Sequence, residues 1–128
     1  MKRLWIVLIT LLILPYQSTN STVEVKRGNI FSSSFTNEYE IIYFVFRNGD
    51  FFSFTTRDKD RVQVNAVFIR SYFASQKRKL TNVVIIIHNH PHGCTLFSDG
   101  DIMFYELLRA YGFNGSFLLY ANGKIYMY

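Results

Sequence analysis

The chain has 128 residues, 49% of them hydrophobic and 18% aromatic, and its formal net charge is +5. About 105 residues remain once a short N-terminal segment is set aside, which is the size of one small domain with enough apolar residues for a core. Cys94 is the only cysteine, so an internal disulfide is excluded, and we expect Cys94 to be a small loop residue.

The first 21 residues have the layout of a secretory signal. Met1-Lys2-Arg3 precedes the apolar stretch Leu4 to Leu14, and Pro15 and a polar run follow. A membrane-spanning helix needs about 20 apolar residues, so residues 1–21 are predicted to be a cleaved signal peptide of an exported protein, periplasmic or secreted. The alternative is a short uncleaved anchor, which would be the chain's one contact with a membrane. Cleavage removes Lys2 and Arg3 and lowers the charge to +3.

A β-hairpin is predicted at the start of the domain. The apolar segments 40–46 and 50–55 flank Asn48-Gly49. Asn-Gly favours positive φ and is the strongest short signal for a two-residue hairpin turn, so the two segments are predicted to pair as antiparallel strands. Glu40 opens the first strand. Glu38 lies two residues earlier and would face the same side of an extended chain.

A helix and a buried strand are predicted next. Apolar residues at helical spacing indicate a helix from about residue 65 to 79, and the continuous Val and Ile run 83–87 indicates a buried strand. We interpret the basic run 76–79 as the last turn of the helix, where cations complement the helix dipole. This interpretation disfavours a phosphate-binding patch, and with it a nucleic-acid partner.

The last third of the chain predicts a second helix and a second hairpin. The helix begins near Ser98, carries apolar residues on one side and ends at Gly112 as a C-cap. Segments 116–120 and 124–128 then flank Asn122-Gly123, the same turn signal as before. The predicted order is β-β-α-β-α-β-β. We therefore expect an α/β (α+β) domain over residues 22–128, with a mixed sheet and two main helices.

All three histidines fall within five residues, directly after the buried strand. Strand side chains alternate between faces, so His88 and His90 project the same way from the strand end. Pro91 and Gly93 break the strand and allow Asp101 to fold back toward the same edge. Two imidazoles and one carboxylate are a typical ligand set for catalytic zinc, so these three residues are predicted to bind Zn²⁺. Iron or manganese would also suit this ligand set.

The spacing His-x-His-x7-Ser-x2-Asp, formed by His88, His90, Ser98 and Asp101, resembles the JAMM signature of MPN-plus (JAB domain) metalloproteases. The form His-Asn-His-Pro-x-Gly is most similar to the RadC-like branch. The resemblance covers residues 36–128. It implies a single-domain, cytidine-deaminase-like JAB/MPN fold, in which a β-sheet wraps against helices.

The resemblance also implies a mechanism and a fourth site residue. His88, His90 and Asp101 would hold zinc, which lowers the pKa of bound water towards about 7. Glu40, at the start of the first strand, fits the family's upstream glutamate best and would carry the proton to the leaving amine. Spacing alone does not separate Glu40 from Glu38. Ser98 would stabilise the oxyanion, so that the reaction would be hydrolysis of a peptide or isopeptide bond.

Each of these residues also has a structural interpretation. Ser98 and Asp101 match a capping box at the start of a helix, a role that is compatible with catalysis. Glu38 and Glu40 could be a polar strand entry on the surface. His92 would share the orientation of His88 and His90 only if the strand continued, so we expect it to be a loop or substrate-side residue. Cys94 lies close enough to the histidines for metal ligation or oxidation to be an alternative role.

Three functions are consistent with these observations. The first is an exported zinc metallopeptidase acting on a protein or peptide substrate. The second is a non-catalytic MPN-type interaction module that retains the histidines but has no functional glutamate. The third is a RadC-like protein associated with DNA, which the predicted export signal argues against. Fold and motif do not identify the substrate, because substrate choice belongs to the loops around the site.

Overall fold

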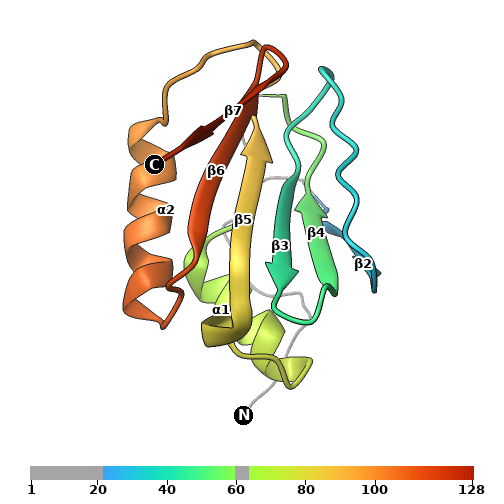
Figure 1. The fold of residues 1–128 in the computed structure, drawn as a ribbon, viewed down its shortest axis with the longest axis vertical. Helices are drawn as coiled ribbons and strands as arrows, with labels where there is room; N and C mark the ends of the chain where they lie inside the picture. The colour runs from blue at the N-terminus through green and yellow to red at the C-terminus, as the bar shows by residue number, and fades with distance from the viewer. Residues whose placement is uncertain (1–21, 60–63) are drawn as a thin grey trace.

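A single mixed sheet organises the protein. The structure is a computed structural model that describes residues 22–59 and 64–128, so the predicted signal peptide lies outside the described residues (Figure 1). Six strands lie in the order β2-β4-β3-β5-β6-β7. The elements in chain order are β2 (Glu24–Gly28), β3 (Ile42–Phe46), β4 (Phe51–Thr55), α1 (Ala66–Ser75), the short 3-10 helix η1 (Leu80–Asn82), β5 (Val83–Asn89), α2 (Asp99–Ala110), β6 (Ser116–Ala121) and β7 (Lys124–Met127).

Both helices pack on one face of the sheet. Ile69 and Phe73 of α1 and Leu108 of α2 belong to one buried cluster with Phe44 of β3 and Ile86 of β5. Burying a large apolar side chain stabilises a fold by about 1.5–3 kcal/mol, so this cluster is the main core. A smaller cluster on the opposite face lies under the segment that leads into β3, with Phe31, Phe35 and Tyr39 packed against Tyr43 and Ile87.

The mixed sheet and two helices confirm the predicted α/β class, and both predicted hairpins form. β3 pairs antiparallel with β4 around a turn in which Gly49 has a φ of 94°. β6 pairs antiparallel with β7 around Asn122 and Gly123, both of which also have positive φ. The Asn-Gly signals therefore correspond to backbone conformations that these residues adopt readily.

β5 is a central strand that contains His88, and His90 directly follows its end. It pairs antiparallel with β3 and parallel with β6, and α2 provides the crossover that a parallel pair requires. The chain passes very close to β5 as it enters β6. A Cβ at Gly115 would lie only 2.3 Å from the Val84 carbonyl oxygen. Only glycine fits there without a shift of the backbone.

The basic run 76–79 is not the last turn of a helix, and this prediction was wrong. α1 ends at Ser75, and Lys77 has a φ of 58°, which is incompatible with a continuing helix. Arg78 then turns back toward the sheet, where its Nη2 donates to Asp50 Oδ2 at 2.7 Å and its guanidinium lies over the Phe46 ring. An ion pair and a cation–π contact therefore account for Arg78 instead of the helix dipole.

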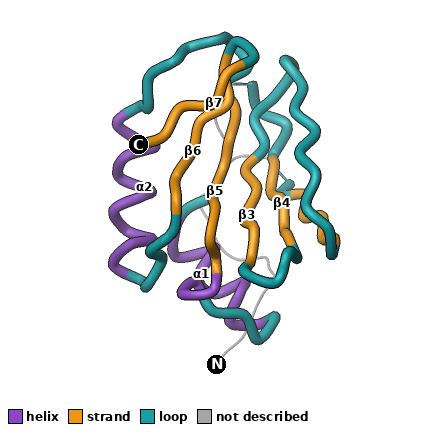
Figure 2. Tube along the Cα trace, viewed as in Figure 1, coloured by secondary structure: helices purple, strands orange, loops and turns teal. Residues whose placement is uncertain are grey.

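One strand was not predicted. β2 pairs antiparallel with β4 at the edge of the sheet, in the register Glu24 to Thr55, and Glu24 also accepts a 2.6 Å hydrogen bond from Arg57. Within residues 22–59 and 64–128, no helix is both long enough and apolar enough to cross a membrane. Figure 2 shows that the loop from β5 to α2, the β6–β7 turn and the segment entering β3 lie at the same end of the sheet. The site lies at this end.

Candidate metal centre

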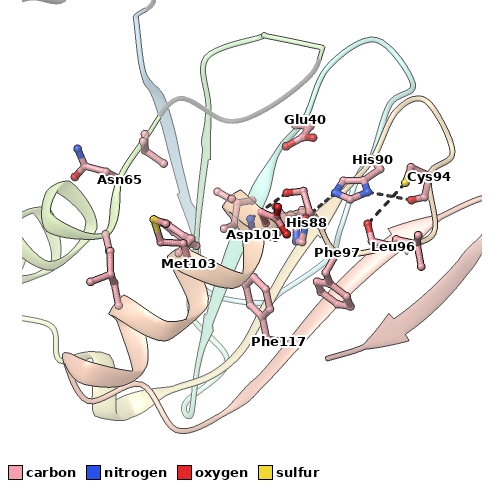
Figure 3. Close-up of a pocket in the computed structure, with 18 of the residues that line it drawn as sticks. Glu40, Asn65, His88, His90, Cys94, Leu96, Phe97, Asp101, Met103 and Phe117 are labelled. Carbon is pink, nitrogen blue, oxygen red and sulfur yellow. Dashed lines mark hydrogen bonds and ion pairs between the residues drawn. The ribbon is translucent and has the colours of Figure 1, made fainter.

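The end of β5 and the start of α2 bring two histidines and one aspartate together. His88 Nε2 lies 3.2 Å from Asp101 Oδ2, and His90 Nε2 lies 3.0 Å from the same oxygen (Figure 3). The potential ligand atoms of the three residues all lie within 4.8 Å of one another, which is close enough for one metal ion to contact all of them. Strand alternation explains why both histidines reach this point, since His88 is in β5 and His90, two residues later, directly follows the strand end.

His90 is oriented by the loop that follows β5. Its Nδ1 lies 2.9 Å from the Cys94 carbonyl oxygen, which can only accept a hydrogen bond, so Nδ1 carries a proton. In the neutral ring this leaves the lone pair on Nε2, the tautomer that a metal ligand needs. Burial by itself would lower the pKa of His90, but the hydrogen bonds with Asp101 and Cys94 outweigh it and raise this pKa to about 9.

His88 is a buried histidine whose ring nitrogens have no hydrogen-bond partner among the described residues. Its side chain is only 4% exposed, and among the described residues neither ring nitrogen has a hydrogen-bond partner of acceptable geometry, despite the 3.2 Å approach to Asp101. Buried polar atoms in folded proteins are nearly always paired, so such an atom requires an explanation. A metal ion at Nε2 supplies one. The ring is fixed in place by Phe117, which stacks on it at 5.5 Å between ring centroids.

Asp101 both caps α2 and contacts the two histidines. Ser98 Oγ accepts from the Asp101 N–H at 3.0 Å, and Asp101 Oδ2 accepts from the Ser98 N–H at 2.9 Å, so the predicted capping box is confirmed. Burial by itself would raise the pKa of the Asp101 carboxyl. The imidazoles of His88 and His90 and the Ser98 N–H instead hold this pKa well below its usual range, so the carboxylate is ionised.

The three residues line one side of a cleft of about 880 Å³. Glu40 and Ser98 line the same cleft, so the structure brings all five predicted site residues to one cavity. The wall formed by α2 and the loop before it is largely apolar. Leu96, Met103 and Leu107 line this wall and are 72%, 66% and 43% exposed to solvent. The cleft therefore combines a polar end with an apolar wall.

The structure separates Glu40 from Glu38. Glu40 is buried, its N–H donates to the Asp58 carbonyl at 3.0 Å and its carbonyl accepts from Thr55 Oγ1 at 2.6 Å. Figure 3 shows its side chain on the cleft side, next to His90, and its negative charge contributes to the raised pKa of His90. Glu38 is exposed and is not among the described residues that line the cleft.

The loop after β5 also positions its own residues as the sequence suggested. Pro91 and Gly93 turn the chain, with a φ of 82° at Gly93 and a hydrogen bond from its N–H to the His90 carbonyl at 2.9 Å. His92 is an exposed loop residue at the cleft edge, and Cys94 carries an exposed free thiol. The contribution of Cys94 that sequence reasoning missed is its backbone carbonyl, which binds His90.

Sequence reasoning also missed Asn89, which lies between the two histidines. Its side chain is directed to the opposite face of β5 and is buried, with an exposed fraction of 2% for the residue. It forms three hydrogen bonds with the segment that carries Glu40. A polar residue inside a buried strand was the available signal, because such a residue needs hydrogen-bond partners.

Comparisons with models of protein families, with curated proteins and with solved structures find no match to this chain. The functional argument therefore rests on the geometry of the described residues. These residues include two imidazoles and one carboxylate that are close enough to bind a metal ion, in a cleft that also contains a buried glutamate and a helix-capping serine.

Proposed function

We propose that this chain is a zinc-dependent hydrolase of the JAMM type, with a single JAB/MPN-like domain, which cleaves peptide or isopeptide bonds. One observation carries the proposal. His88 Nε2 is buried without a hydrogen-bond partner among the described residues, and it faces a carboxylate and a second imidazole at the edge of an open cleft. This is the state expected of a ligand nitrogen, since a structural histidine would have a partner.

The residues present fit zinc. His88, His90 and Asp101 would hold the ion, because two imidazole nitrogens and one carboxylate are a ligand set found in catalytic zinc sites. The Cys94 carbonyl holds the far nitrogen of His90, and the Ser98 N–H holds the carboxylate of Asp101. Such outer contacts fix the orientation of metal ligands. When bound, zinc supplies Lewis acidity, which makes a water molecule acidic near neutral pH.

Glu40 and Ser98 would provide the proton transfer and the oxyanion contact. The Glu40 carboxylate shares the cleft with the histidines and can accept a proton from water and pass it to the leaving amine. Ser98 Oγ uses an acceptor site for the Asp101 N–H, and a hydroxyl that accepts in this way can still donate. Its O–H can therefore stabilise negative charge that develops on the scissile carbonyl oxygen.

The features of the cleft favour the proposal that the substrate is a protein or peptide. It is open and bordered by the apolar side chains of Leu96, Met103 and Leu107, which suit the side chains of a polypeptide. If residues 1–21 direct export, the substrate is met in a periplasm or outside the cell. A nucleic-acid substrate is disfavoured, because Arg78 of the basic run binds Asp50 and packs over Phe46.

The first test is the metal content of the purified full-length chain, measured by elemental analysis on the wild type, His88→Ala and Glu40→Ala. We expect about one zinc per chain in the wild type and in Glu40→Ala, and a loss of zinc in His88→Ala, because of the two substituted residues only His88 is a proposed ligand. Absence of metal from a folded wild-type protein would overturn the proposal.

The second test separates an enzyme from an interaction module. The zinc-loaded chain is incubated with a mixture of unfolded proteins, and new termini are detected by mass spectrometry. We expect cleavage by the wild type and none by Glu40→Ala. Equal results for the two proteins, with zinc bound in both, would favour a non-catalytic module.

A further inference from the structure

Asn89 binds the segment that carries Glu40 on both sides of that glutamate. Its Oδ1 accepts from the Ile41 N–H at 2.8 Å, and its Nδ2 donates to the Tyr39 carbonyl at 3.1 Å and to the Thr36 carbonyl at 2.9 Å. Tyr39 and Ile41 are the two chain neighbours of Glu40. One side-chain amide therefore fixes the backbone immediately before and after the glutamate.

We propose that Asn89 is a positioning residue that holds Glu40 at a fixed place relative to the two histidines. This inference rests on the proposed function, because it assigns Asn89 a role in the same site. His88 in β5 and His90 directly after it contact Asp101 at the start of α2, whereas the side chain of Asn89 is directed to the segment that enters β3. The end of β5 thus holds the histidines on one side and the glutamate segment on the other.

The strand register explains why a side chain is needed here. β3 and β5 pair from Phe46 to Ile42, with Ile42 opposite His88, so Ile41 lies opposite Asn89 just beyond the end of the ladder. β3 begins at Ile42, and the chain before it turns away to bring Glu40 to the cleft. The amide of Asn89 replaces the backbone pairing that the turn has removed, and it keeps the turn attached to β5.

Asparagine suits this place because its amide offers one acceptor and two N–H donors in a plane. Aspartate would lack both donors for the carbonyls of Thr36 and Tyr39, and leucine has the shape but no polar atom. The Ile41 N–H is buried and the Thr36 and Tyr39 carbonyls are partly buried, and leaving such groups unpaired is destabilising. Loss of the amide is therefore expected to release the turn and let Glu40 move relative to the histidines.

The test uses zinc affinity, because a negative charge held in the cleft raises the affinity for a cation. Zinc titration calorimetry is performed on the full-length wild type, Glu40→Gln, Asn89→Leu and the double variant. Glu40→Gln is expected to weaken zinc binding by about tenfold, the scale found for residues around metal ligands. Asn89→Leu is expected to weaken it similarly, and the double variant no further, because both changes remove the same charge from its place.

Tyr43→Phe is the matched control. The Tyr43 hydroxyl ties the same segment to the sheet through Ser34, six residues before Glu40. Its removal takes away hydrogen bonds of the segment but none at the turn that contains Glu40. Zinc affinity is therefore expected to stay within about twofold of the wild type. A matching loss in Tyr43→Phe would show that any loosening of the segment has this effect, and it would overturn the inference.

Asn89→Ser provides a second variant in case Asn89→Leu does not fold. Its hydroxyl can still accept from the Ile41 N–H, so a smaller loss of zinc affinity, about threefold, is expected. An unchanged zinc affinity in the folded Asn89 variants, or additive losses in the double variant, would overturn the inference and leave the proposed function standing. Absence of zinc binding by the wild type would instead overturn the proposed function, and the inference with it.

Discussion

The two helices of this protein begin with the same kind of cap but use the third helical residue differently. In α1, Asn65 Oδ1 accepts from the N–H of Phe68, whose ring packs against the core. In α2, Ser98 Oγ accepts from the N–H of Asp101, whose carboxylate contacts His88 and His90. Both caps line the same cleft. The cap fixes where a helix starts. The side chain at the third position decides whether that start only packs against the core or also contacts the two histidines.

The largest expected effect comes from removing the charge at the third position of α2. Asp101→Asn keeps an oxygen that can accept from the Ser98 N–H, but it removes the anionic ligand. Zinc affinity is expected to fall by more than about 100-fold, since even residues that only support ligands contribute 10–100-fold. Zinc titration calorimetry measures it. Phe68→Leu, the corresponding change in α1, should lower stability and leave zinc affinity unchanged, and a shared effect would contradict the comparison.

The second effect is a pH dependence that arises from His90, which contacts Asp101 at the start of α2. The folded, metal-free protein has a pKa of about 9 at His90, above the ordinary value of about 6.5, so its contribution to stability is complete below about pH 6.5 and is lost as the pH rises through 9. Zinc bound by His90 would displace that proton, so zinc affinity should rise with pH, by up to about tenfold per unit.

Two measurements check this pH dependence. Urea unfolding with a chelator present should show stability that declines above pH 6.5, and zinc titrations between pH 6.5 and 8 should show affinity that increases. His90→Ala serves as the control, because it removes the titrating group. A chelated wild-type protein that gains stability over this range would contradict the assignment.

The third effect is on the caps themselves and should be similar in both helices. Asn65→Ala and Ser98→Ala are each expected to lower the free energy of unfolding by about 1 kcal/mol. Urea unfolding with a chelator present measures both. The difference lies in function, because Ser98→Ala should also slow cleavage by about 100-fold through loss of the oxyanion contact, whereas Asn65→Ala should leave the cleavage rate of the remaining folded protein unchanged.

The smallest effect compares two aspartates in the same turn. Asp99 and Asp101 are both in the first turn of α2, but only Asp101 belongs to the group that can bind a metal. Asp99→Asn should cost only a few tenths of a kcal/mol through the helix dipole and should leave zinc affinity within about twofold of the wild type. A large loss of zinc would show that charge near the helix start is sufficient and that the orientation of Asp101 is unimportant.

Features that depend on neighbouring residues could be predicted from the sequence. The Asn-Gly turns, the capping box at Ser98 and the shared face of His88 and His90 each follow from local backbone rules. The end of α1 is also local but was missed, because a left-handed conformation at Lys77 is uncommon for a residue with a side chain. β2 could not be predicted, because it is stabilised by pairing with β4, whose partner residues are 23 to 31 positions away in the chain.

The residues of the candidate site also differ in whether they could be predicted from nearby sequence. His88, His90, Ser98 and Asp101 lie within one short segment, and their spacing indicated a common point. The choice between Glu40 and Glu38 depends on contacts with Thr55 and Asp58, which spacing does not encode. The hydrogen bonds of Asn89 could not be predicted for the same reason, since its three partners are 48 to 53 residues away.

The closeness of His88, His90 and Asp101 along the chain also bears on how zinc would affect folding. Closing a loop of this length costs little entropy, so the unfolded chain can still gather two or three of these side chains around one ion. Binding to the unfolded state reduces the stabilisation that a ligand provides. Zinc should therefore raise the melting temperature by less than its affinity for the folded protein implies, and it would organise this segment before the sheet is complete.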